Sequence, residues 1–524
     1  MSLIEINPFS LLATTVTSVL SVLLLLAVSR QLWTLRWTLT RDRTSVLPLP
    51  KGSMGWPLFG ETFHWLLEGS TFHISRRGRY GNVFKTHLLG KPVIRVTGAD
   101  NIRKILLGEH KLVSTQWPLS TRIILGPHTL INSVGEHHKR KRKIFATVFS
   151  QAALESYIPR IQEVVRSEVA RWCSVCKAIN VYSATKALTF RIAVRVLLGF
   201  NIEDAQLTHL SKTFEQLMEN LFSLPLDVPF SGLRKGIKAR DILHECMENI
   251  ISQKLREDRS ETYSDALDYM MSSARESGEE LSIQDLKESA VELIFAAYST
   301  TASASTSLVL QLLKNPSVAD KAAQELSSQG VICAEHSVPS SALSEAQVMK
   351  TTKYFNETSR RPELSLEKLD RLRYLDCVVK EVLRILPPVS GGYRTALQTF
   401  ELDGYQIPKG WSVMYSIRDT QETAAVYQNA SLFDPDRFGP ERDEGKAGRF
   451  NYIPFGGGIR SCIGKKLALI ILKTLAVELL SEAKLELATA TFPKMQTVPI
   501  VHPVNGLHVY FNSLYTEAEK SDQA

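Results

Sequence analysis

Apolar residues recur every three or four positions through most of the region from Ala152 to Leu326, a spacing that predicts amphipathic helices. Short β-like runs punctuated by glycine and proline fill Val83 to Thr97, and similar runs return between Tyr405 and Tyr415. Prolines interrupt the helical region between Phe222 and Lys235, and a polar stretch from Ser327 to Leu364 indicates a long loop. We therefore predict a mainly α-helical fold with small β-sheets.

The N-terminus carries a separate apolar run. Ile6 through Ser29 contains no charged residue and is long enough to cross ~30 Å of hydrocarbon as a helix. Only Glu5 precedes the run, whereas five basic residues follow it within a short distance: Arg30, Arg36, Arg41, Arg43 and Lys51. This asymmetry predicts that the C-terminal side faces the cytosol, with Trp33 and Trp37 at the membrane interface. A cleavable signal peptide usually has a shorter apolar core, and a buried hydrophobic hairpin is the other alternative.

Composition favours one large catalytic domain behind this anchor. The chain has 524 residues, 44% of them apolar, and no repeat or low-complexity tract divides it. A proline-rich stretch begins near Leu47, so we place the anchor and its basic juxtamembrane segment at 1–47 and the catalytic domain at 48–524. The six cysteines are too sparse for a disulfide framework, and the Cys173–Cys176 pair lacks the neighbours of a zinc site. Such cysteine usage fits a reducing compartment.

One cysteine stands in a distinctive motif. Cys462 belongs to the run Phe455-Gly456-Gly457-Gly458-Ile459-Arg460-Ser461-Cys462-Ile463-Gly464, which has the pattern F-x-x-G-x-R-x-C-x-G. A thiolate is the metal-binding form of cysteine, and nearby positive charge favours it. Glycines allow the backbone to turn tightly and to approach a flat ligand. A cysteine acting only as a small buried apolar residue would not account for the glycines, the arginine and the aromatic at these spacings.

This pattern resembles the haem-thiolate loop of the cytochrome P-450 superfamily. The resemblance implies the cytochrome P-450 fold behind a single N-terminal transmembrane helix. It also implies that Cys462 ligates the iron of haem b and that Phe455 contacts the cofactor. An axial thiolate favours O–O cleavage, so the implied reaction is a monooxygenation that depends on NADPH and O2. Because no hydride-cofactor site is recognisable in the chain, the electrons are expected from NADPH-cytochrome P-450 reductase.

Three charged residues match structural motifs of the same superfamily. Glu381 and Arg384 form an E-x-x-R pattern on one face of a helix, and Arg437 lies in a P-x-R-F segment. An ion pair at this spacing is weak evidence by itself, since surface pairs are common. The resemblance implies that the three residues form a buried network behind the haem.

A basic run, His137 to Lys143, has two expected roles. His138 and Arg142 occupy the positions of the superfamily's W-x-x-x-R motif, with histidine in place of tryptophan, so both are expected to reach a haem propionate, as is Arg460. The other basic residues are expected to face outward: Lys139, Arg140, Lys141 and Lys143. A basic surface there would dock an acidic redox partner. This interpretation is favoured over nucleic-acid binding and over a merely solvated helix face.

Small and hydroxyl residues cluster between Phe295 and Ser303, where a helix would normally carry a large apolar stripe. The superfamily motif here is A/G-G-x-D/E-T-T. Thr300 matches its oxygen-activating threonine, Ala297 replaces the glycine, and Ser299 replaces the acid. Thr300, with help from Ser299, is therefore expected to organise the water that delivers protons. Close packing of two helices is the alternative.

Within the superfamily, the chain resembles the vertebrate retinoic acid hydroxylases, and their B or C type more than the A type. The segments that carry the resemblance include Leu293–Tyr298, Ser390–Thr395, Ile407–Tyr415 and Pro503–Leu507. The implied reaction is hydroxylation of all-trans-retinoic acid, mainly at C4 of the ring with C18 or C16 as minor sites, for retinoid clearance.

Retinoic acid is a long apolar polyene with one carboxylate, and such a ligand needs a largely dry aromatic pocket with one or two polar groups. The residues expected to line the pocket are Trp117, Phe222, Phe295, Pro388 and Val389. The candidates for the carboxylate are Arg95, Tyr393 and Arg394. For Arg394 a haem propionate is the favoured partner.

Other activities remain open on the sequence. A sterol or other lipid hydroxylase of a related family shares the anchor and all haem motifs, whereas a peroxide-rearranging isomerase would not need Thr300. A haem sensor would need an output module, and none is recognisable. We expect a monomer that binds no nucleic acid, held by a single pass in the endoplasmic reticulum membrane with its catalytic domain in the cytosol.

Overall fold

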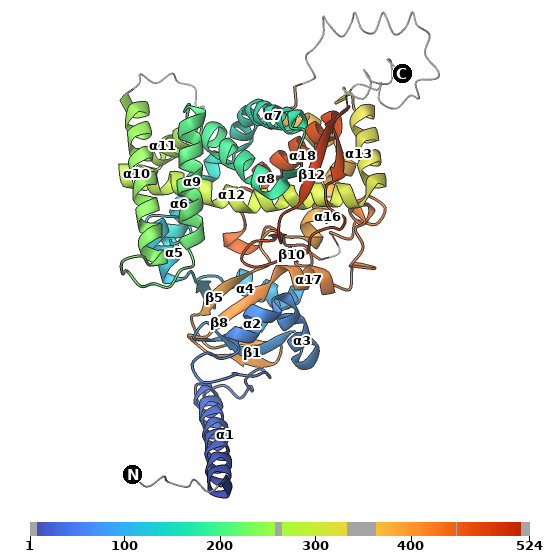
Figure 1. The fold of residues 1–524 in the computed structure, drawn as a ribbon. Helices are drawn as coiled ribbons and strands as arrows, with labels where there is room; N and C mark the ends of the chain where they lie inside the picture. Colours follow the sequence, from blue (N-terminus) through green and yellow to red (C-terminus); the bar gives the residue numbers. More distant parts are fainter. Residues whose placement is uncertain (1–7, 257–264, 333–362, 447, 515–524) are drawn as a thin grey trace, which may run out of the picture. The chain divides into compact units, whose positions relative to one another are not determined.

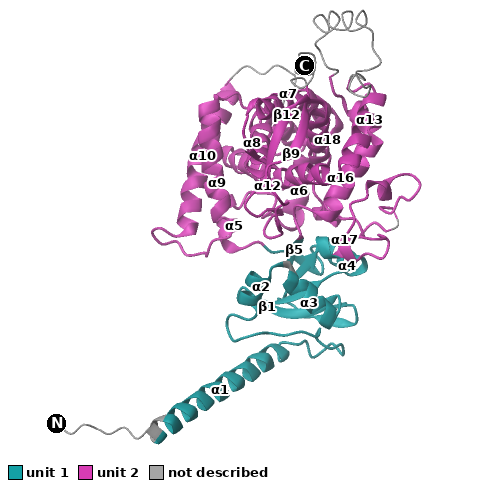
Figure 2. Cartoon of the chain, turned by 45° about the vertical axis from the view of Figure 1, so that its right-hand side comes forward, with its two compact units in different colours: residues 1–116, 391–419 teal, residues 117–390, 420–524 magenta. Residues whose placement is uncertain are grey.

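The computed structural model describes residues 8–256, 265–332, 363–446 and 448–514. The chain forms two compact units, which Figure 2 distinguishes by colour. Unit 1 comprises residues 1–116 and 391–419, and unit 2 comprises residues 117–390 and 420–524. The mainly helical architecture with small sheets is confirmed (Figure 1). Most of the loop predicted between Ser327 and Leu364 lies outside the described residues.

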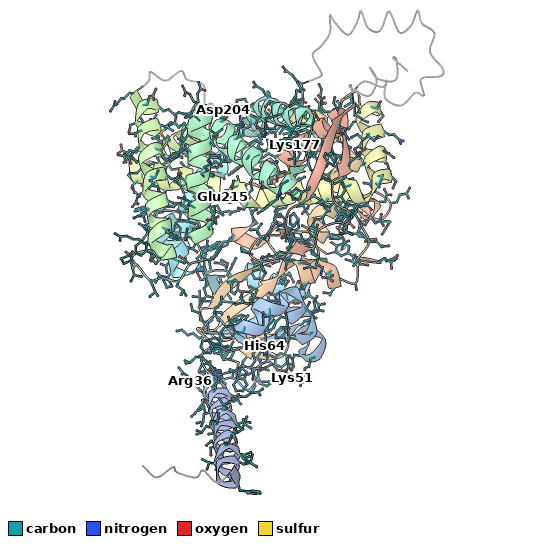
Figure 3. All side chains as sticks on the ribbon, in the orientation of Figure 1. Arg36, Lys51, His64, Lys177, Asp204 and Glu215 are labelled. Atoms are coloured by element: carbon teal, nitrogen blue, oxygen red, sulfur yellow. The ribbon has the colours of Figure 1, made fainter. Side chains whose placement is uncertain are left out.

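The apolar N-terminal run forms helix α1 (Pro8–Thr38) in unit 1. The helix extends beyond Ser29, so that Arg30 and Arg36 lie on it rather than after it. Most of its described side chains are exposed (Figure 3, where Arg36 is labelled near the end of the helix). By length and composition α1 could cross a membrane; α12 (Ile283–Lys314) passes the same test, but it is a core helix and mostly buried.

The end of α1 packs against the rest of unit 1. The rings of Trp33 and Trp37 lie 5.0 and 5.4 Å from the ring of His87, and Trp37 lies 6.2 Å from Trp411. Trp33 Nε1 donates a hydrogen bond of 3.1 Å to the Met54 carbonyl. The two tryptophans expected at the membrane interface thus also contact the protein, where an amphipathic indole finds apolar neighbours and a carbonyl acceptor.

Unit 1 is built on a five-stranded sheet of order β1-β2-β8-β5-β3. Its strands are β1 (Val83–Leu88), β2 (Lys91–Val96), β8 (Ser412–Ser416), β5 (Gly391–Ala396) and β3 (Val113–Thr115). Strands β2 and β8 are parallel, with Val93 opposite Ser412, and the other neighbours are antiparallel. The unit also contains α2 (Thr62–Glu68), α3 (Ser70–Tyr80), α4 (Ala99–Leu107), β6 (Phe400–Leu402) and β7 (Tyr405–Ile407). The strand regions predicted from the sequence are therefore confirmed.

Unit 2 packs its helices around one large apolar core. Its α-helices are α5 (Leu119–Leu125), α6 (Gly135–Val148), α7 (Gln151–Ser174), α8 (Val181–Arg191), α9 (Asp204–Asn220), α10 (Gly232–Arg256), α11 (Ala266–Glu276), α12, α13 (Pro316–Ser328), α15 (Leu366–Arg371), α16 (Arg373–Ile385) and α18 (Lys465–Glu482). The π-helix η1 (Ile192–Leu197) and the short 3-10 helices η4 (Pro435–Phe438) and η5 (Gly458–Arg460) also belong to this unit. Helix α17 (Ile417–Thr423) spans the chain boundary between the units. Small sheets complete unit 2: β4 (Ile179–Asn180) with β12 (His508–Ser513) and β9 (Ala483–Leu487), and β10 (Met495–Gln496) with β11 (His502–Pro503).

Helix α12 is the element that carries the candidate distal residues. It begins at a capping box in which the Ser282 hydroxyl and the Asp285 carboxylate each bind the other's backbone amide. All residues from Thr301 to Leu310 are buried, so this part of the helix lies within the core of unit 2 although half of its side chains carry hydroxyl groups. Helix α18 begins directly after the cysteine loop.

Candidate functional site

The cysteine loop of unit 2 is folded by its own backbone. The Cys462 amide donates a 2.9 Å hydrogen bond to the Phe455 carbonyl, which closes the loop into a turn. Gly456 and Gly458 have φ angles of +68° and +66°, in the left-handed region that residues with a Cβ rarely adopt. The path of the chain that presents Cys462 therefore requires these two glycines.

The surroundings of the Cys462 thiol have opposing effects on its pKa. The Cys462 side chain keeps an exposed face, but the protein packed around it raises the pKa of the thiol. The Gly464 backbone amide and the positive charges of Arg142 and Lys465 oppose this rise. A metal cation removes the thiol proton outright, so these donors would support the thiolate once a metal ion is bound.

Two arginines connect the cysteine loop to the start of α6. Arg142 Nη2 donates to the Ser461 carbonyl at 2.8 Å, and Arg460 Nη2 donates to the Ser133 carbonyl at 2.6 Å. His138, on the same helix as Arg142, is buried. The structure thus brings two of the expected propionate donors, Arg142 and Arg460, to the loop that carries Cys462.

Helix α12 changes character at the distal motif. Residues on either side are buried, but Ala296 is exposed, and Phe295, Ala297 and Thr300 are partly exposed. The Thr300 hydroxyl donates to the Ala296 carbonyl at 2.7 Å, whereas Ser299 is buried. At the distal motif, helix α12 therefore leaves two alanines and one hydroxyl accessible, next to the ring of Phe295.

These features fit a haem. The loop offers one thiol with cationic neighbours, its glycines leave the backbone bare, and α12 offers a flat face of small residues. Phe455 and Ala297 are both packed against the unit 2 core. Cys462 would ligate the iron, and Arg142 and Arg460 are within unit 2 to bind carboxylates of the cofactor.

Glu381, Arg384 and Arg437 form one buried ionic network. Glu381 accepts hydrogen bonds from Arg384 Nε at 2.6 Å and from Arg437 Nε at 3.0 Å, and all three side chains are at most 1% exposed. Arg437 also pairs with Glu444 at 3.0 Å, and Arg384 donates to the Ala430 carbonyl. The network joins α16 to η4, in the segment that precedes the cysteine loop.

Among the expected pocket residues of unit 2, the structure brings Trp117 and Phe295 together. Their ring centroids are 6.4 Å apart in an edge-on arrangement. Pro388 is buried, Val389 is partly buried, and the Pro388 carbonyl accepts a bond from the Val501 amide. Phe222 is 53% exposed, so it contributes an exposed apolar surface rather than a buried wall.

The expected carboxylate contacts lie in unit 1. Arg95 is 4% exposed and pairs through Nη2 with Asp419 at 2.9 Å, and within the described residues its Nε and Nη1 have no partner. Burial works to raise the pKa of Asp419, but Arg95 and Ser416 outweigh it and the pKa is lowered. Burial raises the pKa of Tyr393 against the charge of Arg95, which leaves the phenol as a neutral donor.

Arg394 is bound differently from Arg95. Its Nε donates to Glu109 at 2.7 Å, and the Glu109 side chain is 1% exposed. Burial works to lower the pKa of Arg394, but Tyr415 and Glu109 outweigh it and the pKa is raised. Within unit 1, Arg394 thus has a carboxylate partner of its own, which the sequence did not indicate.

The outward-facing assignment for the basic run is wrong in part. Lys141 is largely occupied by the protein itself, because its ammonium contacts the His128 carbonyl and lies 3.4 Å from Asp285. Lys139 and Lys143 are exposed, and Lys139 pairs with the exposed Glu136. The α6 surface that could face a partner is therefore smaller than the sequence suggested.

The chain is similar to known proteins over almost its whole length. A model of the family described as cytochrome P450 matches residues 50–509. Human cytochrome P450 26C1 is 61% identical over 508 residues, which cover 96% of each chain. Mouse cytochrome P450 26B1 is 56% identical over 505 residues, covering 96% of this chain and 94% of that protein. A solved structure of retinoic acid bound cyanobacterial CYP120A1 matches with a TM-score of 0.76 and 31% identity, covering 89% of this chain and 100% of that chain.

Proposed function

Because this chain belongs to the cytochrome P450 family, we propose that it is a haem-thiolate monooxygenase that hydroxylates all-trans-retinoic acid. The family expected from the cysteine loop is confirmed by the family match over residues 50–509. The proposed products are hydroxylated mainly at C4 of the ring, with C18 or C16 as minor positions. The hydroxylation makes the retinoid more polar and so serves its clearance.

The cysteine loop carries the proposal for the reaction type. When bound, the haem supplies an iron that activates dioxygen with two electrons and two protons, so that one oxygen atom enters the substrate and the other leaves as water. Cys462 would be the iron ligand, with His138, Arg142, Arg460 and Arg394 as candidate donors to the propionates. Thr300 would hold water at the distal face.

The substrate proposal rests on one observation above all. The solved structure of CYP120A1, which is 31% identical and matches almost the full chain, contains bound retinoic acid. The residues of unit 2 add the aromatic pair Trp117 and Phe295, suited to a polyene. Unit 1 adds Arg95, a buried cation with two unpartnered nitrogens among the described residues, which suits a carboxylate.

The electrons and the location follow from the same family membership. Electrons come from NADPH through a separate reductase, and we propose NADPH-cytochrome P-450 reductase as that partner. Helix α1, exposed and apolar, supports a single-pass anchor, and we place it in the endoplasmic reticulum membrane with the catalytic residues in the cytosol. We further propose that residues 48–524 work as one catalytic domain and that the protein is a monomer.

The decisive experiment is turnover by the full-length protein with NADPH and reductase. All-trans-retinoic acid is compared with a panel of sterols, and the products are identified by mass spectrometry. We expect mono-hydroxylated retinoic acid, formed only when NADPH, O2 and reductase are all present. Sterol oxidation without retinoid oxidation would replace this proposal with a sterol hydroxylase, and product formation without NADPH would indicate an isomerase.

A further inference from the structure

An irregular loop, residues 126–133, joins α5 to α6 and is held by acidic side chains of α12. Glu288 accepts a 2.7 Å hydrogen bond from the His128 amide. Glu292, one turn further along α12, accepts bonds from the Leu130 amide at 2.7 Å and from the Ile131 amide at 2.8 Å. Two carboxylates on one helical face thus accept hydrogen bonds from three backbone amides of the loop, those of His128, Leu130 and Ile131.

Both carboxylates are deeply buried. Glu288 is 2% exposed and Glu292 is 3% exposed. Gly126 has a φ of +93°, and a Cβ added to it would lie 2.3 Å from the Glu288 carboxyl carbon. Only glycine therefore lets the loop approach Glu288 this closely. A buried carboxylate that binds backbone amides makes charge-assisted bonds, which are stronger than those between neutral groups.

The same loop leads to the cysteine loop. Within it, the Ser133 hydroxyl donates to the Thr129 carbonyl at 2.7 Å, and the Asn132 side-chain amide donates to the Gly126 carbonyl at 2.7 Å. The Ser133 carbonyl accepts the 2.6 Å bond from Arg460, two residues before Cys462. Hydrogen bonds and the loop backbone together therefore connect Glu292 to the cysteine loop.

We propose that Glu288 and Glu292 are positioning residues that lock the 126–133 loop to α12 and thereby fix Arg460 and the cysteine loop. The lock joins the distal helix to the proximal ligand segment through the 126–133 loop. Neither glutamate belongs to a motif of the cysteine loop, and neither is assigned a contact with the cofactor. The proposal rests on the proposed function only in taking Cys462 as a haem ligand.

Glu292 also makes the lock sensitive to pH. Burial raises the pKa of Glu292 to about 7, while the two loop amides and Lys141 oppose the rise and Glu288 adds to it. Asp285 and the His128 ring, which lie 3.3 Å apart, are two further titratable groups beside the loop. As pH falls through 7, Glu292 gains a proton and loses its charge, so its bonds to the loop weaken.

Amide hydrogen exchange of the haem-loaded, full-length protein tests the lock. Exchange at Leu130 and Ile131 is corrected for the intrinsic pH dependence and followed from pH 8 to pH 6. We expect protection to fall with pH in the wild type. In Glu292→Gln we expect protection about five- to tenfold lower at pH 8 and nearly constant with pH, because a charged acceptor is replaced by a neutral one of similar size. Glu280→Gln, an exposed acid just before α12, is the matched control.

Unchanged protection in Glu292→Gln would overturn the proposal. If that variant fails to fold, Glu288→Gln is measured at the His128 amide instead, and unchanged protection there overturns the proposal. The reach to the cysteine loop is tested by the reduction potential of the haem iron across the same pH range. We expect the pH profile to differ between the wild type and Glu292→Gln, and identical profiles would refute the link to Arg460. Neither measurement uses a substrate, so failure of the retinoid assignment leaves the test intact.

Discussion

Arg95 offers the sharpest test of how a carboxylate is recognised. The guanidinium is buried in unit 1, where its Nη2 forms a salt bridge with Asp419. Its Nε and Nη1 have no hydrogen-bond partner among the described residues. Buried donors without partners cost free energy, and a ligand carboxylate would relieve that cost. The substitution Arg95→Gln removes the charge but keeps a polar side chain in the same strand.

The expected magnitude follows from the kind of bond that is lost. A hydrogen bond between charged groups contributes about 1.5–3 kcal/mol, and one to a neutral carbonyl about 0.5–1.5 kcal/mol. At 1.4 kcal/mol per factor of ten, Arg95→Gln should lower kcat/KM for retinoic acid about ten- to hundredfold. For retinal, which has the same polyene but an aldehyde, the loss should be about two- to tenfold.

The assay is NADPH-dependent turnover of both retinoids by full-length protein with reductase. The quantity that decides is the ratio of the two losses, because general damage to the fold affects both retinoids alike. Arg394→Gln is the matched control, since Arg394 is also a buried arginine of unit 1 but is already paired with Glu109. Equal losses of kcat/KM for retinoic acid and retinal in Arg95→Gln would refute the role of Arg95 in binding the carboxylate. A loss confined to retinoic acid in Arg394→Gln would assign that role to Arg394 instead.

Three further predictions concern other parts of the site. Glu381→Gln leaves two buried arginines without their shared carboxylate and should destabilise the protein by about 3–5 kcal/mol, whereas the exposed Glu367→Gln should cost less than about 0.5 kcal/mol. Thermal unfolding measures both, and similar melting temperatures would contradict the network's role. Thr300→Ala should raise hydrogen peroxide release per NADPH consumed, and unchanged coupling would reduce Thr300 to a packing residue. Lys139→Glu should raise the KM for reductase, more so at low salt, while Lys141→Glu should mainly affect stability.

Local sequence patterns predicted those parts of the molecule that depend on neighbours in the chain. The apolar spacing indicated the helices of unit 2, and the cysteine loop could be recognised because its turn is closed by a bond between Cys462 and Phe455. The E-x-x-R pattern likewise placed Glu381 and Arg384 on one helical face. Each of these features depends on residues at fixed, short spacings, so a short segment of sequence is enough to predict it.

Long-range partners could not be predicted in this way. Asp419 is 324 positions from Arg95, and Glu292 is 162 positions from Leu130, so no spacing connects them. The loss of Lys141 from the outward surface has the same origin, since its partner Asp285 lies on a distant helix. In each case a buried or half-buried charge found an opposite charge or a backbone donor, because the cost of burying it alone would be prohibitive. The structure therefore adds most information about charged residues that lie outside any sequence motif, because it shows their partners. Among them is Glu292, whose bonds to the 126–133 loop connect the distal helix to the segment that carries Cys462.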